Sequence, residues 1–459
     1  MKLKKMVRYT RSKKDKKIRK RIVVSDVVYP FNGLRDISES VKLQLTLRCC
    51  YKEISSRVPE RKLKAVQLIR KLLSVGREPP IDEVVNSGVL PHVVRCLEYR
   101  SSYTLQFEAA WVLTNICGGS SLQTQTVVSA GAVPLFLNLL LVGNYKVCEQ
   151  VVWAIGNIIG DGSILRDYLI GLNFLPKLIH FIDRRVPPPF MRHISWTLLN
   201  MCRQTEPPLD LSVIDELIPA FSILLHNADS RVIIDVLWGV SYLVDCGHEH
   251  IDRFLDSGLV SKFVSFLADS EPEVRAAAMR VVGNIGTGTN EQAQTLIDGG
   301  ALTVLPDVMS SAKTCKEAIW FLSNVMAGTP QQIQAVIDSD LLPTIITCLQ
   351  IRTYDTRKEA VWCVLHLTIN GTVEQKLAAI QAGAVEPLCE LLTCDDGELV
   401  HMVLVGLLNV IMTVMPEKEE LCSEIENCKG LATIKKLRNN SNPEISRLAN
   451  EIMKNVFIN

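Results

Sequence analysis

Six tryptophans recur along the chain, and a polar or aromatic residue follows each of them four positions later. Successive tryptophans lie 42, 43 and 42 residues apart at first, and the 82-residue gap before the fifth holds one further register, Arg280 with Asn284. An indole face attracts a Lys or Arg side chain, and a primary amide can hydrogen-bond an extended peptide backbone. The spacing therefore predicts a ladder of positions that bind cations and peptide backbone. The pairs are Trp111 with Asn115, Trp153 with Asn157, Trp196 with Asn200, Trp238 with Tyr242, Trp320 with Asn324, and Trp362 with His366.

A third polar position lies three residues before each tryptophan. At about 100° per residue this position falls on the Trp/Asn side of a helix, whereas Ala109, Val112 and Ile116 fall on another side. A single tryptophan at helical spacing is usually a core residue. Six copies, four of them followed by Asn, favour a binding ladder instead. The third position holds Glu108, Gln150, His193, Asp235, Glu317 and Glu359.

A second marker repeats with the same period and gives the fold class. It consists of a small or polar residue, two apolar residues and often a proline, which indicates one helix ending and another beginning. Helical units of about 42 residues are typical of armadillo and HEAT proteins. We therefore expect an all-α, right-handed superhelical solenoid of about ten armadillo-type units, with the Trp-bearing helices on its concave side. The marker occurs at 88–91, 131–134, 173–176, 216–219, 258–260, 300–302, 340–343 and 383–385, and the units are expected over 61–99, then seven to about 394, then 395–427 and 428–457.

Charge divides the chain into a basic arm and an acidic body. Residues 1–22 contain twelve Lys or Arg and one acid, whereas the other 437 residues contain 38 basic and 48 acidic side chains. Such an arm commonly binds nucleic acid or is disordered, but here the body offers it an intramolecular partner. Residues 23–60 are expected to form a linker with part of a helix, and 61–457 the repeats.

Other classes of function receive little support from the sequence. Fourteen cysteines lack CxxC pairs, and no apolar run is long enough to span a bilayer, so we expect a reduced, intracellular protein with cysteines in its core. There is no phosphate-binding glycine loop, nucleophile elbow or HExxH motif. The segment Cys246–His250 holds three candidate metal ligands but no fourth, and we interpret it as an exposed loop. The sequence predicts no enzyme, metal site or cofactor.

Several local motifs resemble one family within the armadillo class. They are Pro79–Val84, Trp153–Asp161, Trp196–Arg203 before Pro207-Pro208, Ser241–Asp245, Gly283–Ile285 before Thr287-Gly288-Thr289, and Lys316–Asn324. Together they make the region from Arg61 to Phe457 similar to the importin-α (karyopherin-α) nuclear import adaptors. That resemblance implies a groove that binds lysine- and arginine-rich nuclear localisation signals, with the basic side chains between successive indoles.

The resemblance also implies two sites, which a bipartite signal would span. In the major site, Asp161 would pair with the deepest lysine, in a pocket completed by Gly119 and Thr124. The minor site has His366 in place of Asn and Ala293 in place of a pocket threonine, so we expect it to bind basic peptides more weakly. The implied major site is Trp111, Asn115, Gly119, Thr124, Gln150, Trp153, Asn157, Asp161, Trp196, Asn200, Arg203, Asp235 and Trp238. The implied minor site is Asn284, Glu317, Trp320, Ser323, Asn324, Glu359, Trp362 and His366.

The basic arm is similar to a shortened importin-β-binding segment. The resemblance implies that it binds importin-β and, when unbound, competes for the chain's own groove, through Arg11, Lys13, Lys14, Arg19, Lys20 and Arg21. Residues 425–431 and 444–445 resemble the last repeat, where the nuclear export receptor engages together with Ran-GTP. The implied protein shuttles between cytoplasm and nucleus and binds neither membrane nor nucleic acid. Two alternatives stay open: an armadillo scaffold of the β-catenin or vacuolar type, and a protein that binds nucleic acid through residues 1–22.

Overall fold

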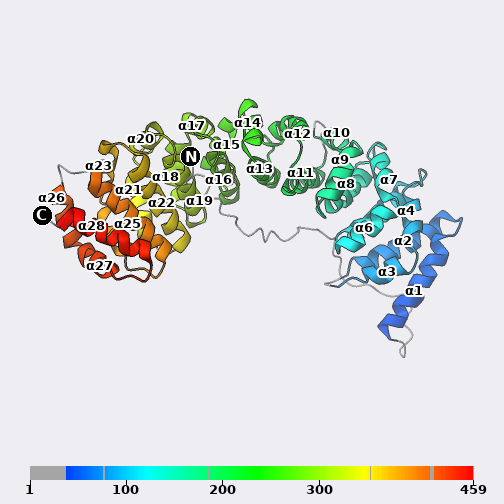
Figure 1. Cartoon of the computed structure of the whole chain (residues 1–459). Coiled ribbons are helices and arrows are strands. Elements are labelled where there is room, and N and C mark those ends of the chain that lie inside the picture. The colour runs from blue at the N-terminus through cyan, green and yellow to red at the C-terminus, as the bar shows by residue number, and fades with distance from the viewer. Residues whose placement is uncertain (1–37, 76–77, 183–185, 352, 414–417, 458–459) are drawn as a thin grey trace. The chain divides into compact units, whose positions relative to one another are not determined.

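The computed structural model describes residues 38–75, 78–182, 186–351, 353–413 and 418–457, and within these ranges it contains helices and no strand. The basic arm, 1–22, lies outside the described residues. Contacts divide the described chain into an N-terminal unit ending at Leu243 and a C-terminal unit beginning at Val244. Within each unit the helices follow one another in chain order (Figure 1). The expected all-α armadillo fold is confirmed.

The N-terminal unit contains the first thirteen helices. They are α1 (Glu39–Ile54), α2 (Pro59–Leu73), α3 (Ile81–Asn86), α4 (Leu90–Cys96), α5 (Tyr103–Cys117), α6 (Ser121–Ser129), α7 (Ala132–Leu139), α8 (Tyr145–Ile159), α9 (Ser163–Gly171), α10 (Phe174–Ile179), α11 (Pro188–Arg203), α12 (Leu211–Leu224) and α13 (Ser230–Val244), the last of which ends at the boundary.

The C-terminal unit continues the pattern. Its helices are α14 (His248–Asp256), α15 (Val260–Ser265), the short 3₁₀ helix η1 (Phe266–Ala268), α16 (Pro272–Gly286), α17 (Asn290–Asp298), α18 (Ala301–Met309), α19 (Ala312–Met326), α20 (Pro330–Asp338), α21 (Leu342–Leu349), α22 (Tyr354–Asn370), α23 (Val373–Gln381), α24 (Val385–Leu391), α25 (Gly397–Thr413), α26 (Lys418–Asn427), α27 (Gly430–Leu437) and α28 (Pro443–Phe457).

A typical repeat is two short helices followed by a long one, as α6, α7 and α8 illustrate. Ser120 caps α6 by accepting from the backbone N–H of Gln123, whose side chain returns to the Ser120 N–H. Gly131 then takes φ 81° between α6 and α7, a left-handed conformation that costs glycine little. Asn144 caps the long helix α8. These local signals confirm the helix break that the second marker predicts.

The long helices carry the ladder and build the core. Consecutive long helices α5, α8 and α11 pack on one another, as do α16, α19, α22 and α25. Their apolar side chains, such as Val112, Ile155 and Leu198, are completely buried. Each such side chain contributes about 1.5–3 kcal/mol relative to exposure. Nine of the fourteen cysteines are also buried, in agreement with their expected place in the core.

Glutamines of the capping boxes join one repeat to the one before it. The side-chain amide of Gln123 donates to Asp82 at 2.6 Å, and that of Gln332 donates to the carbonyl of Asn290 at 2.8 Å. Gln292 and Gln375 make the corresponding contacts, to the carbonyls of His248 and Pro330. The same side chains thus cap a helix and connect neighbouring repeats.

One expected helix break is wrong. The marker at 216–219 predicts a new helix, but α12 continues through it with Pro219 inside. Elsewhere the break uses a residue with positive φ, either Gly or one of Asn173, Asp340 and Lys429. Glu216 offers no such preference and is a good helix former, so the helix continues.

Part of the expected linker belongs to the stack. Within residues 23–60, α1 packs against α2 and α4 and buries Leu47, Cys50 and Ile54. The Tyr51 ring meets His92 edge-on, with ring centroids 5.0 Å apart. The helical stack of the described chain begins at Glu39 with α1, which lies in the segment expected to hold part of a helix, and the expected first repeat begins within α2.

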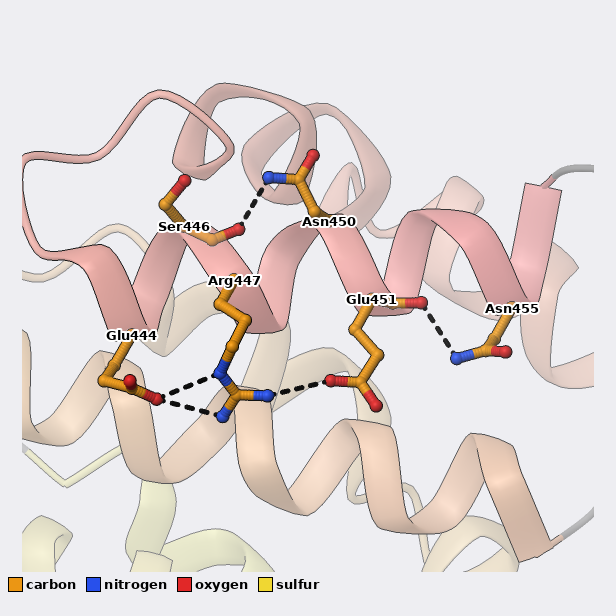
Figure 2. A network of polar contacts seen from close by, with 6 residues as sticks. All are labelled: Glu444, Ser446, Arg447, Asn450, Glu451 and Asn455. Atoms are coloured by element: carbon orange, nitrogen blue, oxygen red, sulfur yellow. Dashed lines mark hydrogen bonds and ion pairs between the residues drawn. The ribbon is translucent and has the colours of Figure 1, made fainter.

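The last helix carries a polar network that Figure 2 shows along α28. Arg447 lies between two acids of its own helix, with its Nη2 2.9 Å from Glu444 and its Nη1 3.0 Å from Glu451. These side chains are largely exposed. Contacts three and four residues apart support the helix locally.

Candidate peptide-binding ladder

The three ladder asparagines of the N-terminal unit bind the backbone of the preceding repeat. The side-chain amide of Asn157 donates to the Thr114 carbonyl at 3.1 Å, and that of Asn200 donates to the Gly156 carbonyl at 3.0 Å. Asn115 donates to the Leu73 carbonyl at 3.3 Å and to the Ser74 hydroxyl at 3.1 Å. All three side chains are at most 1% exposed.

The ladder therefore has a structural role that sequence spacing alone did not reveal. The accepting carbonyls of Thr114 and Gly156 belong to residues three positions after a tryptophan, so each amide joins one long helix to the next. Each carbonyl also accepts from a backbone N–H of its own helix, that of Gly118 or Gly160, so removing the amide costs about one hydrogen bond, or about 0.5–1.5 kcal/mol. Whether the amides also bind a peptide stays a prediction.

His366 makes the same connection in the C-terminal unit. Its Nδ1 lies 2.9 Å from the Ser323 carbonyl, and because a carbonyl only accepts, this nitrogen donates. The imidazole also lies 5.2 Å from the Trp362 ring, centroid to centroid. The substitution of His for Asn therefore preserves the contact between repeats.

Two arginines of the chain already lie on ladder tryptophans. The Arg70 guanidinium lies 4.4 Å from the centroid of Trp111 and its Nε lies 2.6 Å from a carboxylate oxygen of Glu108. In the C-terminal unit the Arg280 guanidinium lies 5.8 Å from the centroid of Trp320. Its Nη2 is 2.9 Å from Glu317. In both places an indole and the acid three residues before it hold one cation.

Sequence spacing identified Arg280 but missed Arg70. Arg70 precedes Trp111 by 41 residues, close to the period of the ladder, so the same interval extended backwards would have found it. The ladder tryptophans form two arrays, Trp111 to Trp238 in the N-terminal unit and Trp320 with Trp362 in the C-terminal unit. Each arginine occupies the position of the tryptophan in the repeat that precedes one of these arrays. The arginines therefore lie at the start of the N-terminal and C-terminal arrays.

Glycines make room for two of the tryptophans. A Cβ on Gly156 would lie 2.5 Å from Cζ3 of Trp196, and a Cβ on Gly283 would lie 2.6 Å from Cζ3 of Trp320. Trp196 is only 2% exposed, whereas the other five tryptophans are half-buried. Trp238 packs obliquely on Tyr242, with centroids 6.4 Å apart.

Three acidic side chains accept hydrogen bonds from serines of the preceding repeat. The hydroxyl of Ser121 donates to Asp161 at 2.8 Å, and Ser195 donates to Asp235 at 2.8 Å. Ser323 donates to Glu359 at 3.2 Å. Burial raises the pKa of the Glu359 carboxyl above its usual range, although the Ser323 hydrogen bond and nearby lysines oppose that shift. A cation placed beside Glu359 would favour its ionised form.

The remaining major-site candidates serve local packing. Gly119 is required by the α6 capping box, because a Cβ there would lie 1.9 Å from Oε1 of Gln123. Thr124 is completely buried, with its hydroxyl near the carbonyls of Cys117 and Ser120 at 3.2 and 3.1 Å. The Gln150 amide donates to the Thr114 hydroxyl at 2.7 Å. The Arg203 guanidinium lies 6.0 Å from the Tyr242 ring.

The remaining minor-site candidates lie on α16 and α19. Asn284 and Ser323 are buried, and the Ser323 hydroxyl, whose single proton faces Glu359 at 3.2 Å, also lies 2.9 Å from the Trp320 carbonyl. The Asn324 amide donates to that carbonyl, at 2.9 Å, and so stays within its own helix. Ala293 occupies in α17 the position that Thr124 occupies in α6 and is 2% exposed, without a hydroxyl.

All major-site candidates thus lie in the N-terminal unit and all minor-site candidates in the C-terminal unit. The candidate metal segment is not simply a loop, because His248 begins α14 and its Nδ1 lies 3.2 Å from Gln292. Within the described ranges no group of three or more metal-binding side chains is assembled, and no helix is long and apolar enough to cross a membrane.

The fold and ladder define an armadillo-repeat protein, and comparisons with known proteins agree. The family model of the armadillo/β-catenin-like repeat matches residues 77–118, 120–160, 329–369 and 372–411. An engineered protein of known crystal structure aligns with 90% of this chain and 98% of its own, with a TM-score of 0.77 and 22% identity. This last similarity concerns the fold alone.

Similar natural proteins give the family. Importin subunit alpha-3 of Caenorhabditis elegans is 44% identical over 413 residues, which cover 90% of this chain and 80% of that protein. Importin subunit alpha-1b of Oryza sativa subsp. japonica is 35% identical over 406 residues, covering 86% and 76%. The chain belongs to the importin-α family, whose role is that of a nuclear import adaptor.

Proposed function

We propose that this chain binds lysine- and arginine-rich nuclear localisation signals along the Trp/Asn ladder and links such cargo to importin-β. The observation that carries the proposal is that two tryptophans of the ladder already bind an arginine of the chain itself. At Trp111 and at Trp320, a guanidinium lies over the indole and pairs with the acid three residues before it. A cargo cation would meet the same pair of indole and acid at Trp238, which Asp235 precedes by three residues, and at Trp362, which Glu359 precedes by three.

The acids of the ladder suit the same ligand. Asp161, Asp235 and Glu359 are each oriented by a serine hydroxyl of the preceding repeat. A pre-oriented carboxylate loses little freedom when it pairs with a lysine. We propose Asp161 as the partner of the principal cargo lysine in the N-terminal unit and Glu359 as an acid of a second site in the C-terminal unit.

The rest of the proposal follows from family membership and charge. The basic arm at residues 1–22 binds importin-β and, when unbound, competes with cargo for the acidic body. An attached competitor acts at an effective concentration of about a millimolar. The last repeat engages the nuclear export receptor with Ran-GTP, and the protein shuttles between cytoplasm and nucleus. Direct binding of nucleic acid is not part of this function.

The test is the affinity of a fluorescent lysine-rich bipartite peptide for the full chain and for a chain that begins at Ser38. The truncation keeps α1, because that helix packs on α2. Truncation should raise the affinity, and Asp161→Lys should reduce it by at least tenfold, since it replaces an attractive charge by a repulsive one. Absence of binding by both chains would favour the general armadillo scaffold.

A control addresses the nucleic-acid alternative. If the arm acts on nucleic acid, the full chain will bind a short RNA or DNA with an affinity that falls steeply with salt, and removing residues 1–37 will abolish this binding. If the arm instead competes for the ladder, the full chain will bind nucleic acid weakly and cargo affinity will rise on truncation.

A further inference from the structure

One histidine covers a ladder tryptophan in the N-terminal unit. The His193 imidazole of α11 lies 4.4 Å from the Trp153 ring of α8, centroid to centroid, with 33° between the planes. This separation is close enough for stacking. Because His193 belongs to the next long helix, the covered face of Trp153 is the one toward α11.

This arrangement differs from the two arginine positions. Arg70 and Arg280 belong to the repeat before their tryptophan and lie at the start of an array. His193 belongs to the repeat after Trp153 and lies within an array, between two tryptophans of the expected major site. A cargo side chain that enters between Trp153 and Trp196 therefore meets an imidazole on one side. On the other side is a tryptophan only 2% exposed.

His193 is held less firmly than the other ladder histidine. His366 donates Nδ1 to a backbone carbonyl at 2.9 Å. The Nδ1 of His193 has only the Glu149 carboxylate near it among the described residues, at 3.3 Å and outside hydrogen-bond geometry. Both side chains are partly exposed, 16% for His193 and 26% for Glu149. The imidazole is therefore retained by stacking and by one loose contact with an acid.

We propose that His193 is a specificity-determining residue, which closes the Trp153 slot to a cargo cation and relaxes the requirement for lysine or arginine at that one position of the signal. This inference rests on the proposed function. A cation gains from an indole only when it lies within about 6 Å of an open ring face, and here the imidazole already occupies the face toward α11. Glu149, which would otherwise be available to a cargo cation in that slot, instead faces His193.

The experiment is an alanine scan of a monopartite lysine-rich peptide. The affinity of each peptide variant is measured for the full wild-type chain and for the full chain with the His193→Asn substitution. In the wild type, alanine at the position over Trp153 should reduce affinity by less than about threefold. In His193→Asn the same position should cost about tenfold, the size of one good cation–indole contact. Glu149→Gln removes the contact that retains the imidazole and serves as a second variant, which should shift the same position in the same direction.

Two further variants make the result specific. The peptide position that lies over Trp153 is the one whose alanine substitution costs more affinity in His193→Asn than in the wild type. This extra loss should disappear when Trp153→Ala is added to His193→Asn. His226→Asn is the matched control, since His226 is exposed, follows the end of α12 and hydrogen-bonds the Ser222 carbonyl; its scan should equal that of the wild type. An unchanged scan in His193→Asn, with normal binding of the parent peptide, overturns this inference alone. A wild-type chain that binds no basic peptide overturns the proposed function and this inference with it.

Discussion

The contact between Gly156 and Trp196 gives a prediction whose size can be worked out. An alanine Cβ at 156 would lie 2.5 Å from Cζ3 and 3.0 Å from Cε3 of Trp196, and 2.7 Å from the Thr197 hydroxyl. Optimal separations between carbon atoms are about 3.5–4.0 Å. In Gly156→Ala the indole of Trp196 must therefore move by about 1 Å.

Two opposing terms set the stability of this variant. Replacing glycine by alanine inside a helix stabilises it by about 1 kcal/mol. Overpacking a buried site costs about 1–3 kcal/mol. Gly156→Ala should therefore be destabilised by about 0–2 kcal/mol in the free energy of unfolding. The control is Gly239→Ala in the same unit, where the nearest atom to the new Cβ is the Cys202 sulfur at 3.6 Å, an ordinary contact.

The assay combines urea unfolding with peptide affinity. Gly239→Ala should gain about 1 kcal/mol of stability, so that Gly156→Ala lies about 1–3 kcal/mol below it. Displacing Trp196 should also weaken a lysine-rich peptide by about three- to tenfold, the size of one cation–indole contact. If Gly156→Ala matches the control in both stability and affinity, Trp196 is not held in place by the glycine and our reasoning is refuted.

Three further predictions use other parts of the ladder. Asn157→Ala should lower the free energy of unfolding by about 0.5–1.5 kcal/mol even without peptide, because the Thr114 carbonyl loses the Asn157 amide and keeps only the Gly118 N–H as donor, and urea unfolding measures this. Glu359→Gln should raise the melting temperature at neutral pH and weaken peptide binding in the C-terminal unit. The pKa of Glu359 is raised in the folded chain, so the stability of the wild type falls as pH rises through that pKa. The difference in melting temperature between Glu359→Gln and the wild type should therefore vanish below the ordinary pKa of glutamate. In monopartite peptide titrations, Asp161→Lys should reduce affinity by at least tenfold and Glu359→Arg by less; a larger loss from Glu359→Arg would contradict a weaker minor site.

Periodicity was sufficient to predict the fold. The tryptophans and the Gly-apolar-apolar marker recur regularly because every repeat packs its helices against its neighbours in the same way. The prediction failed at Glu216, where the repeat departs from its own consensus. There, local helix preference decided the outcome, and α12 continues through the expected break.

Contacts between repeats could not be predicted in the same way. The sequence placed Asn115, Asn157 and Asn200 on one side of their helices, but the direction of each amide depends on which carbonyl of the neighbouring helix lies within reach. The stacking of His193 on Trp153 also depends on the offset between α8 and α11, which no spacing within one helix reveals.

The buried asparagines change how the ladder should be interpreted. A side chain that both joins repeats and lies beside the expected peptide path will lose stability and binding together when it is removed, so a mutation at Asn157 cannot by itself assign it to either role. The tryptophan faces and the acids separate the two roles better. The Ser121 hydroxyl of the preceding repeat donates to Asp161, whose side chain is 9% exposed, so a charge reversal there has to be followed in both stability and peptide affinity. A loss of peptide affinity in Asp161→Lys without a matching loss of stability would therefore show that the ladder is a binding surface as well as a connection between repeats.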